Sequence, residues 1–177
     1  VRKLDYSIQI SKLFYERFLQ GGEITLFSPH DVPGLFDAFG TDRFDDMYLS
    51  AERDDSIPRK TVGAQELFLN ILKERAETGR LYIMNIDHCN SHSSFKDKVN
   101  MSNLCQEITL PTDPIQSIDD AYGEIALCIL SAINVGKIHK LDEMEELCDL
   151  AVRGLEELID YQSYPVAAAE RATKARR

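Results

Sequence analysis

Segments of helical periodicity alternate with short apolar segments along this whole sequence, and this alternation constrains the fold most. We expect amphipathic helices over residues 5–19, 42–53, 65–78 and 141–161, and strands over residues 23–27, 80–85 and 123–131. No linker, repeat or low-complexity run divides the 177 residues. The pattern is typical of an α/β fold and predicts a single structural unit over residues 1–177.

Particular residues mark the ends of these segments. Gly21-Gly22 should stop the first helix, and Gly79 should cap the one that ends at residue 78. Ser28, followed by Pro29, is typical of a helix start, which makes His30 a surface residue of that turn rather than a catalyst. The polar stretch over residues 87–100 is expected to be a long loop.

Two segments in the second half carry cysteines. Residues 123–131 are almost continuously apolar, as in a parallel strand covered on both faces, and include Cys128. In the expected strand Cys128 shares a side with Glu124, Ala126 and Leu130. Cys148 lies in the 141–161 helix among core-type residues, so we expect it to be inert packing.

The composition excludes several functions. With a net charge of -10 the chain is a poor match for a nucleic-acid backbone. No run approaches the roughly 18 apolar residues of a membrane helix, and residues 1–5 do not resemble a signal peptide, so we expect a soluble, cytoplasmic protein that binds neither nucleic acid nor membrane. The first residue is not Met, and a helix-like run reaches Arg177, so we expect a piece of a longer protein.

The four cysteines do not form the framework of a small secreted scaffold, so each is judged by its neighbours. His88, Cys89 and His92 could ligate zinc. They lack a second pair at the usual spacing, and no CxxC exists, so we expect no metal there.

The most informative segment covers residues 101–111. If it is extended, Asn103, Cys105 and Glu107 point to one side and present an amide, a thiol and a carboxylate to one sugar-sized molecule. An amphipathic edge strand in an acidic α/β binding module without catalysis explains the same pattern. The residues alone leave both interpretations open.

Several motifs, in order along the chain, resemble the large (alpha) subunit of class I ribonucleotide reductases, nearest the bacterial class Ia type. They are Ser102-Asn-Leu-Cys-Gln-Glu-Ile108, Asn85-Ile-Asp-His-Cys-Asn-Ser-His92, Gly123-Glu-Ile-Ala-Leu-Cys128, Ile24-Thr-Leu-Phe-Ser-Pro-His-Asp-Val-Pro-Gly34, Gly79-Arg-Leu-Tyr-Ile83 and Tyr161-Gln-Ser-Tyr-Pro165. Class Ib shares the cysteine motif, and only the flanking sequence favours Ia.

The resemblance implies part of a ten-stranded α/β barrel, with a finger loop at about residues 100–112 that carries the radical cysteine. Cys105 matches the thiyl radical that removes the 3′ hydrogen of a ribonucleoside diphosphate. Glu107 matches the general base for the 3′ hydroxyl, and Asn103 matches the amide that hydrogen-bonds and orients the substrate. Cys128 matches one half of the redox-active dithiol.

The resemblance also implies what this chain lacks. The partner of Cys128, the phosphate-holding loop, the radical-relay tyrosines and the C-terminal cysteine pair should lie outside it, as should most of the ATP and dNTP effector sites. We therefore expect the isolated piece to be inactive, and poorly soluble because half a barrel exposes strand edges.

The implied partners are a small (beta) subunit, whose diiron-tyrosyl centre supplies the radical, and thioredoxin or glutaredoxin as reductant. A second large subunit completes a homodimer, and no cofactor is expected within this chain. A cysteine hydrolase built on Cys105 is a weak rival, because Glu107 two residues away disfavours a thiolate.

Overall fold

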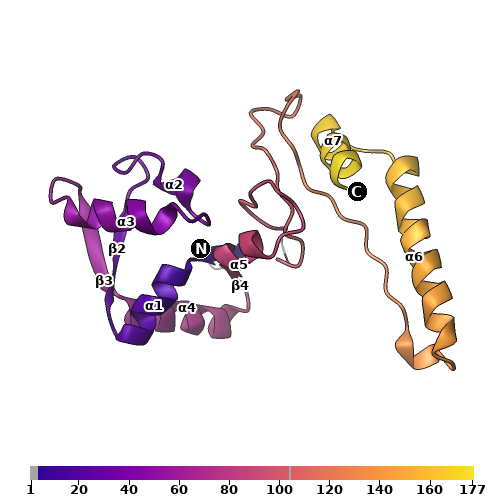
Figure 1. Ribbon diagram of the computed structural model, residues 1–177, viewed down its shortest axis with the longest axis horizontal. Coiled ribbons are helices and arrows are strands. Elements are labelled where there is room, and N and C mark those ends of the chain that lie inside the picture. The colour runs from indigo at the N-terminus through magenta and orange to yellow at the C-terminus, as the bar shows by residue number, and fades with distance from the viewer. Residues whose placement is uncertain (1–3, 104) are drawn as a thin grey trace. The chain divides into compact units, whose positions relative to one another are not determined.

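The computed structural model describes residues 4–103 and 105–177, which form two compact units, Val1–Thr109 and Leu110–Arg177 (Figure 1). Each unit is described by itself. That residues 1–177 form one unit of a catalytic barrel stays a prediction. No helix in the described part of the chain is both long and apolar enough to cross a membrane.

Two strand pairs organise the first unit. β1 (Tyr6–Ile10) lies parallel to β4 (Leu81–Asn85), and β2 (Glu23–Phe27) lies antiparallel to β3 (Arg59–Gly63). The helix expected from residue 5 therefore starts too early, because residues 6–10 pair with a segment more than 70 residues away. Mixed helices and strands confirm the α/β class, whereas the β3 strand was not predicted.

Local capping explains two of the helices. α1 (Lys12–Gln20) begins at Ser11, whose Oγ accepts a hydrogen bond from the Phe14 N–H at 3.4 Å. It ends at Gly21, and α4 (Ala64–Thr78) ends at Gly79, both with a left-handed φ of about 65°. The glycine stops predicted from the sequence are confirmed.

Three further helices belong to this unit: α2 (Leu35–Ala38), α3 (Phe44–Arg53) and α5 (Ile86–Ser91). α3 confirms the helix expected over 42–53. The helix start at Ser28 is wrong, because the Ser28 hydroxyl caps only a local turn, accepting from the His30 N–H at 3.2 Å. α5 replaces the first part of the expected loop.

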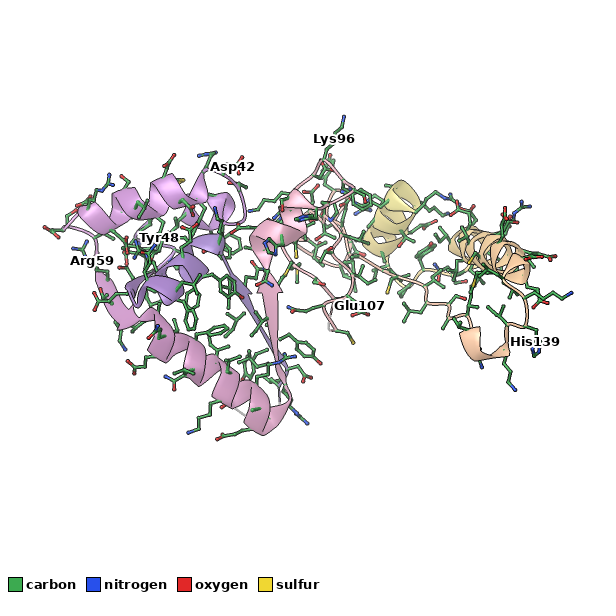
Figure 2. The ribbon with its side chains drawn as sticks, turned by 60° about the horizontal axis from the view of Figure 1, so that its bottom comes forward. Asp42, Tyr48, Arg59, Lys96, Glu107 and His139 are labelled. Carbon is green, nitrogen blue, oxygen red and sulfur yellow. The ribbon has the colours of Figure 1, made fainter. Side chains whose placement is uncertain are left out.

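The core of this unit consists of three apolar clusters. Ile10, Phe14, Ile24 and Ala64 form the first, Leu13, Ala38, Phe44 and Tyr48 the second, and Met84, Ile86 and Val99 the third. Tyr48, labelled in Figure 2, is held by its hydroxyl, which accepts from the Thr25 N–H at 2.7 Å and donates to the Thr25 carbonyl at 2.8 Å. The Tyr48 hydroxyl therefore satisfies the backbone hydrogen-bonding groups of Thr25 in β2 from inside the core.

The second unit contains a 3₁₀ turn (Val135–Lys137) and the helices α6 (Asp142–Tyr161) and α7 (Ala167–Arg176). α6 confirms the expected helix. The strand expected over residues 123–131 is absent from the described residues, although it is apolar, because no neighbouring segment pairs with its backbone as a strand. A parallel strand is stable only within such a ladder.

The side chains of α6 correct a second expectation. Cys148 is exposed, as are Leu147, Leu150 and Leu158 on the apolar side of the helix. Cys148 is therefore not packed in a core within the described chain. Buried residues of this unit lie instead mainly on α7, where Ala168, Ala169 and Ala172 are buried, and at Pro111 and Gly123.

Candidate active-site loop

The loop that carries Cys105, residues 100–109, contains a tight turn instead of an extended strand. The Gln106 N–H donates to the Asn103 carbonyl at 3.2 Å, and Gln106 has a left-handed φ of 61°. The expected period-two alternation of residues 103, 105 and 107 is therefore wrong, because the chain reverses between Asn103 and Gln106. We call residues 100–109 the cysteine loop.

The side chain of Asn103 closes this turn. Its Oδ1 accepts from the Ile108 N–H at 3.0 Å and from the Ser102 hydroxyl at 3.1 Å, while the Ser102 Oγ also lies 2.5 Å from the Ile108 carbonyl. Within the described residues no hydrogen bond uses Asn103 Nδ2. One end of this amide thus holds the loop, and the other remains available to a ligand.

Cys105 and Glu107 lie beyond this closure. Both are exposed, and the labelled Glu107 can be followed on the loop in Figure 2. Leu104, between Asn103 and Cys105, lies outside the described residues. The structure thus places a free thiol and a carboxylate two residues apart on an accessible loop.

Helix α5, which precedes the cysteine loop, is fastened to α1 within the first unit. The Asp87 carboxylate accepts from the Lys12 N–H at 2.5 Å, at the start of α1 where the helix dipole favours negative charge. The Tyr15 hydroxyl donates to Asn85 Oδ1 at 2.7 Å. This helix was not predicted, although the apolar Ile86 just after a strand was a signal for it.

The segment around Cys128 belongs to the second unit. Ala126, Cys128 and Leu130 are exposed, whereas Ile125, Leu127 and Ile129 are partly covered, so side chains alternate with period two even without a strand ladder. Glu124 is half-buried and pairs with Arg176 at 2.9 Å. The thiol of Cys128 is free.

A turn anchored by Asp120 precedes this segment. Its carboxylate accepts from the N–H groups of Gln116, Tyr122 and Gly123 at 2.7–2.8 Å. These hydrogen bonds, led by the one from Gly123, lower the pKa of Asp120 to about 2. Arg171 of α7 binds the carbonyls of Asp120 and Gly123 at 2.7 and 2.6 Å, so the turn is fastened to α7.

The histidine-bearing helix α5 has a packing role. The rings of His88 and His92 meet edge to face at 5.8 Å, and Cys89 packs on the Met84, Ile86 and Val99 cluster, where burial raises the pKa of its thiol. Among the residues that the structure describes, no group of three or more His, Cys, Asp or Glu side chains is placed to hold a metal. The expectation of no metal stays a prediction.

Sequence comparison identifies the family. Residues 1–177 match the family described as ribonucleotide reductase, barrel domain. The chain belongs to this family, which confirms the resemblance found in its motifs.

Individual relatives of the chain are ribonucleoside-diphosphate reductase alpha subunits, in agreement with the family match. The chain is 57% identical to the ribonucleoside-diphosphate reductase subunit alpha of Haemophilus influenzae and 56% identical to the ribonucleoside-diphosphate reductase 1 subunit alpha of Escherichia coli, over 100% of this chain in both cases. It is 41% identical to subunit alpha of enterobacteria phage T4 over 99% of its length. In each case it spans 24% of the relative.

Proposed function

We propose that the protein containing this chain is the catalytic subunit that reduces ribonucleoside diphosphates to deoxyribonucleoside diphosphates for DNA precursor synthesis. The main support for the proposal is that all 177 residues match ribonucleoside-diphosphate reductase alpha subunits, at up to 57% identity. The binding-module alternative gives no reason for this similarity to extend through the cysteine loop.

Cys105 is the proposed radical residue. As a thiyl radical it removes the 3′ hydrogen of the ribose, and as a thiol it can return a hydrogen and be regenerated. Its position at a turn, with an exposed side chain, supports this role because the sulfur must reach a bound sugar. The barrel of the complete protein would shield the radical from water and from other thiols.

Glu107 and Asn103 assist at the same sugar. Glu107 takes the proton of the 3′ hydroxyl, a general-base role worth typically 10²–10⁴-fold in rate. Asn103 hydrogen-bonds the substrate. The available Nδ2 supports a donor role toward a sugar oxygen, since Oδ1 is already occupied by Ile108 and Ser102.

Cys128 is the proposed half of the dithiol that reduces the 2′ position and ends as a disulfide. Its free, exposed thiol is compatible with exchange. The partner cysteine is assigned to the remainder of the protein. In the complete protein, residues 123–131 pair as a strand with segments outside this chain. These strands complete a ten-stranded barrel around the finger loop.

The remaining components follow from the class. A separate beta subunit with a diiron-tyrosyl centre supplies the radical, thioredoxin or glutaredoxin re-reduces the disulfide, and two alpha subunits form a homodimer in the cytoplasm. ATP and dNTP effectors bind largely outside residues 1–177. No cofactor is assigned to this chain.

The test uses the full-length subunit with its radical-generating partner and a dithiol reductant. Incubation with a ribonucleoside diphosphate should yield the deoxyribonucleoside diphosphate, measured by chromatography. No product from a folded, nucleotide-binding protein would contradict the proposal. The isolated 177-residue chain should yield none, and turnover by it would show that the missing parts are not required.

A further inference from the structure

We propose that Asn90 is a positioning residue for the radical chemistry, because its side chain fixes the chain where it enters the cysteine loop. The inference rests on the proposed function of Cys105. It concerns a residue that touches neither the sulfur nor the sugar.

The amide of Asn90 bonds both backbone groups of Val99. Its Oδ1 accepts from the Val99 N–H at 2.7 Å, and its Nδ2 donates to the Val99 carbonyl at 3.1 Å and to the Ile86 carbonyl at 3.2 Å. Only a side chain that both donates and accepts can replace a neighbouring strand in this way. Asn90 thereby joins α5 to the start of the loop.

The clamped residue is itself immobilised. Val99 is fully buried, packed with Met84, Ile86, Phe39 and Cys89. Its backbone could not slide by one residue without exposing this side chain and burying a polar neighbour.

The packing around Asn90 leaves it little freedom. A Cβ on Gly40 would lie 2.9 Å from Asn90 Nδ2 and 2.5 Å from Ile86 Cγ1. Gly40 also has a φ of 77°, which disfavours any side chain. The absence of a side chain at residue 40 is therefore what admits the amide to this position.

Further contacts fasten the loop to β1 on both sides of the turn. Gln9 Nε2 donates to the Asn100 carbonyl at 2.6 Å, and Gln106 Nε2 donates to Ser7 Oγ. Only five residues separate Val99 from Cys105, so a shift at Val99 is transmitted to the sulfur. A misplacement of about 1 Å between reacting atoms can cost roughly 10²-fold in rate.

The experiment uses the full-length subunit with its radical-generating partner and compares substrates carrying hydrogen or deuterium at the 3′ position. Asn90→Ala should lower kcat by at least about tenfold with little change in KM, and should increase the deuterium isotope effect on kcat, because hydrogen removal becomes slower. Asn90→Asp should be at least as impaired, since a carboxylate cannot donate to the two carbonyls.

The matched control is Asn70→Ala, the same change on an exposed position of α4, which should leave kcat and the isotope effect unchanged. A merely structural role for Asn90 would reduce the amount of active enzyme without changing the isotope effect, and that result would overturn the inference. If Asn90→Ala does not fold, Gln9→Ala provides the same measurement at the second anchor, and an unchanged isotope effect there would also overturn it.

The experiment distinguishes a failure of the proposed function of Cys105 from a failure of the positioning role of Asn90. If Cys105→Ser retains turnover, the proposed function itself is wrong. If Cys105→Ser is inactive while Asn90→Ala matches the parent, only the positioning inference fails.

Discussion

Asn103 holds Ile108 across the turn that presents Cys105, through an Oδ1 to N–H hydrogen bond of 3.0 Å. The same amide is the group proposed to bind the sugar. We therefore propose that one side chain shapes the loop with its oxygen and binds the substrate with its nitrogen.

The separate roles of the Asn103 oxygen and nitrogen predict different results for two substitutions in the full-length subunit. Asn103→Asp keeps an acceptor for Ile108 and Ser102 but loses the donor, so kcat/KM should fall by about 10- to 100-fold, with thermal stability close to that of the parent. Asn103→Ala loses both functions and should show a larger kinetic loss. Parent-like kcat/KM in Asn103→Ala would contradict both roles.

Cys128→Ser should separate the early and late steps of reduction. Removal of the 3′ hydrogen by Cys105 is retained, whereas the 2′ position lacks its dithiol, so substrate exchange or breakdown is expected without multiple turnover. Product counted per subunit in the presence of excess reductant checks this. Normal multiple turnover would show that Cys128 is outside the redox pair.

The ion pair between Arg17 and Glu52 predicts a pH dependence of stability. The Arg17 guanidinium meets the Glu52 carboxylate with both nitrogens, one of the contacts at 2.6 Å, and stacks 5.4 Å from the Tyr48 ring centroid. Burial favours a raised pKa for Glu52, but the hydrogen bonds, chiefly from Arg17, outweigh it and lower the pKa below its usual value. The carboxylate is therefore favoured in the folded state.

A lowered folded-state pKa means that this contribution is present above the unfolded pKa of about 4.3 and is lost as the pH falls below it. Glu52→Gln should reduce the free energy of unfolding of the full-length subunit by about 1–2 kcal/mol at pH 7, and by less at pH 3. Glu16→Gln, at an exposed pair with Lys12, is the control and should change little. Equal losses at both pH values would contradict the assignment.

The Asp120 turn gives a second acid-sensitive element. Because the pKa of Asp120 is lowered to about 2, its contribution should be complete above about pH 4 and should fall away as the pH approaches 2. Asp120→Ala should make the 113–124 segment more susceptible to limited proteolysis at pH 7. Asp119→Asn, on the adjacent exposed residue, should not, and equal cleavage in the two variants would refute the role of Asp120.

What could be predicted from the sequence depended on where the stabilising partners lie. Gly21 and Gly79 end helices through local backbone geometry, and α6 follows from its own periodicity, so these were found. β1 was taken for helix because its partner β4 is remote in sequence. β3 was missed because its residues, such as Arg59 and Lys60, are polar and exposed.

The same distinction between local and remote stabilising partners applies to the candidate site. Its residues were identified through the motif around Cys105, but their arrangement was not, because the turn depends on Gln106 adopting a left-handed φ and on the side chain of Asn103. Glutamine at such a position is uncommon, so propensity did not indicate it. Asn90 carries no local signal at all, since its role depends on Val99 nine residues later.

The most direct test of the account is the removal of the 3′ hydrogen by the full-length subunit carrying Cys105→Ser, with Cys148→Ser as the matched control on the exposed face of α6. Both proteins should bind nucleotide normally. If Cys105 is the radical residue, Cys105→Ser should release no label from a 3′-tritiated ribonucleoside diphosphate and form no deoxyribonucleotide, while Cys148→Ser should do both at the parent rate. Substantial label release by Cys105→Ser would contradict this role.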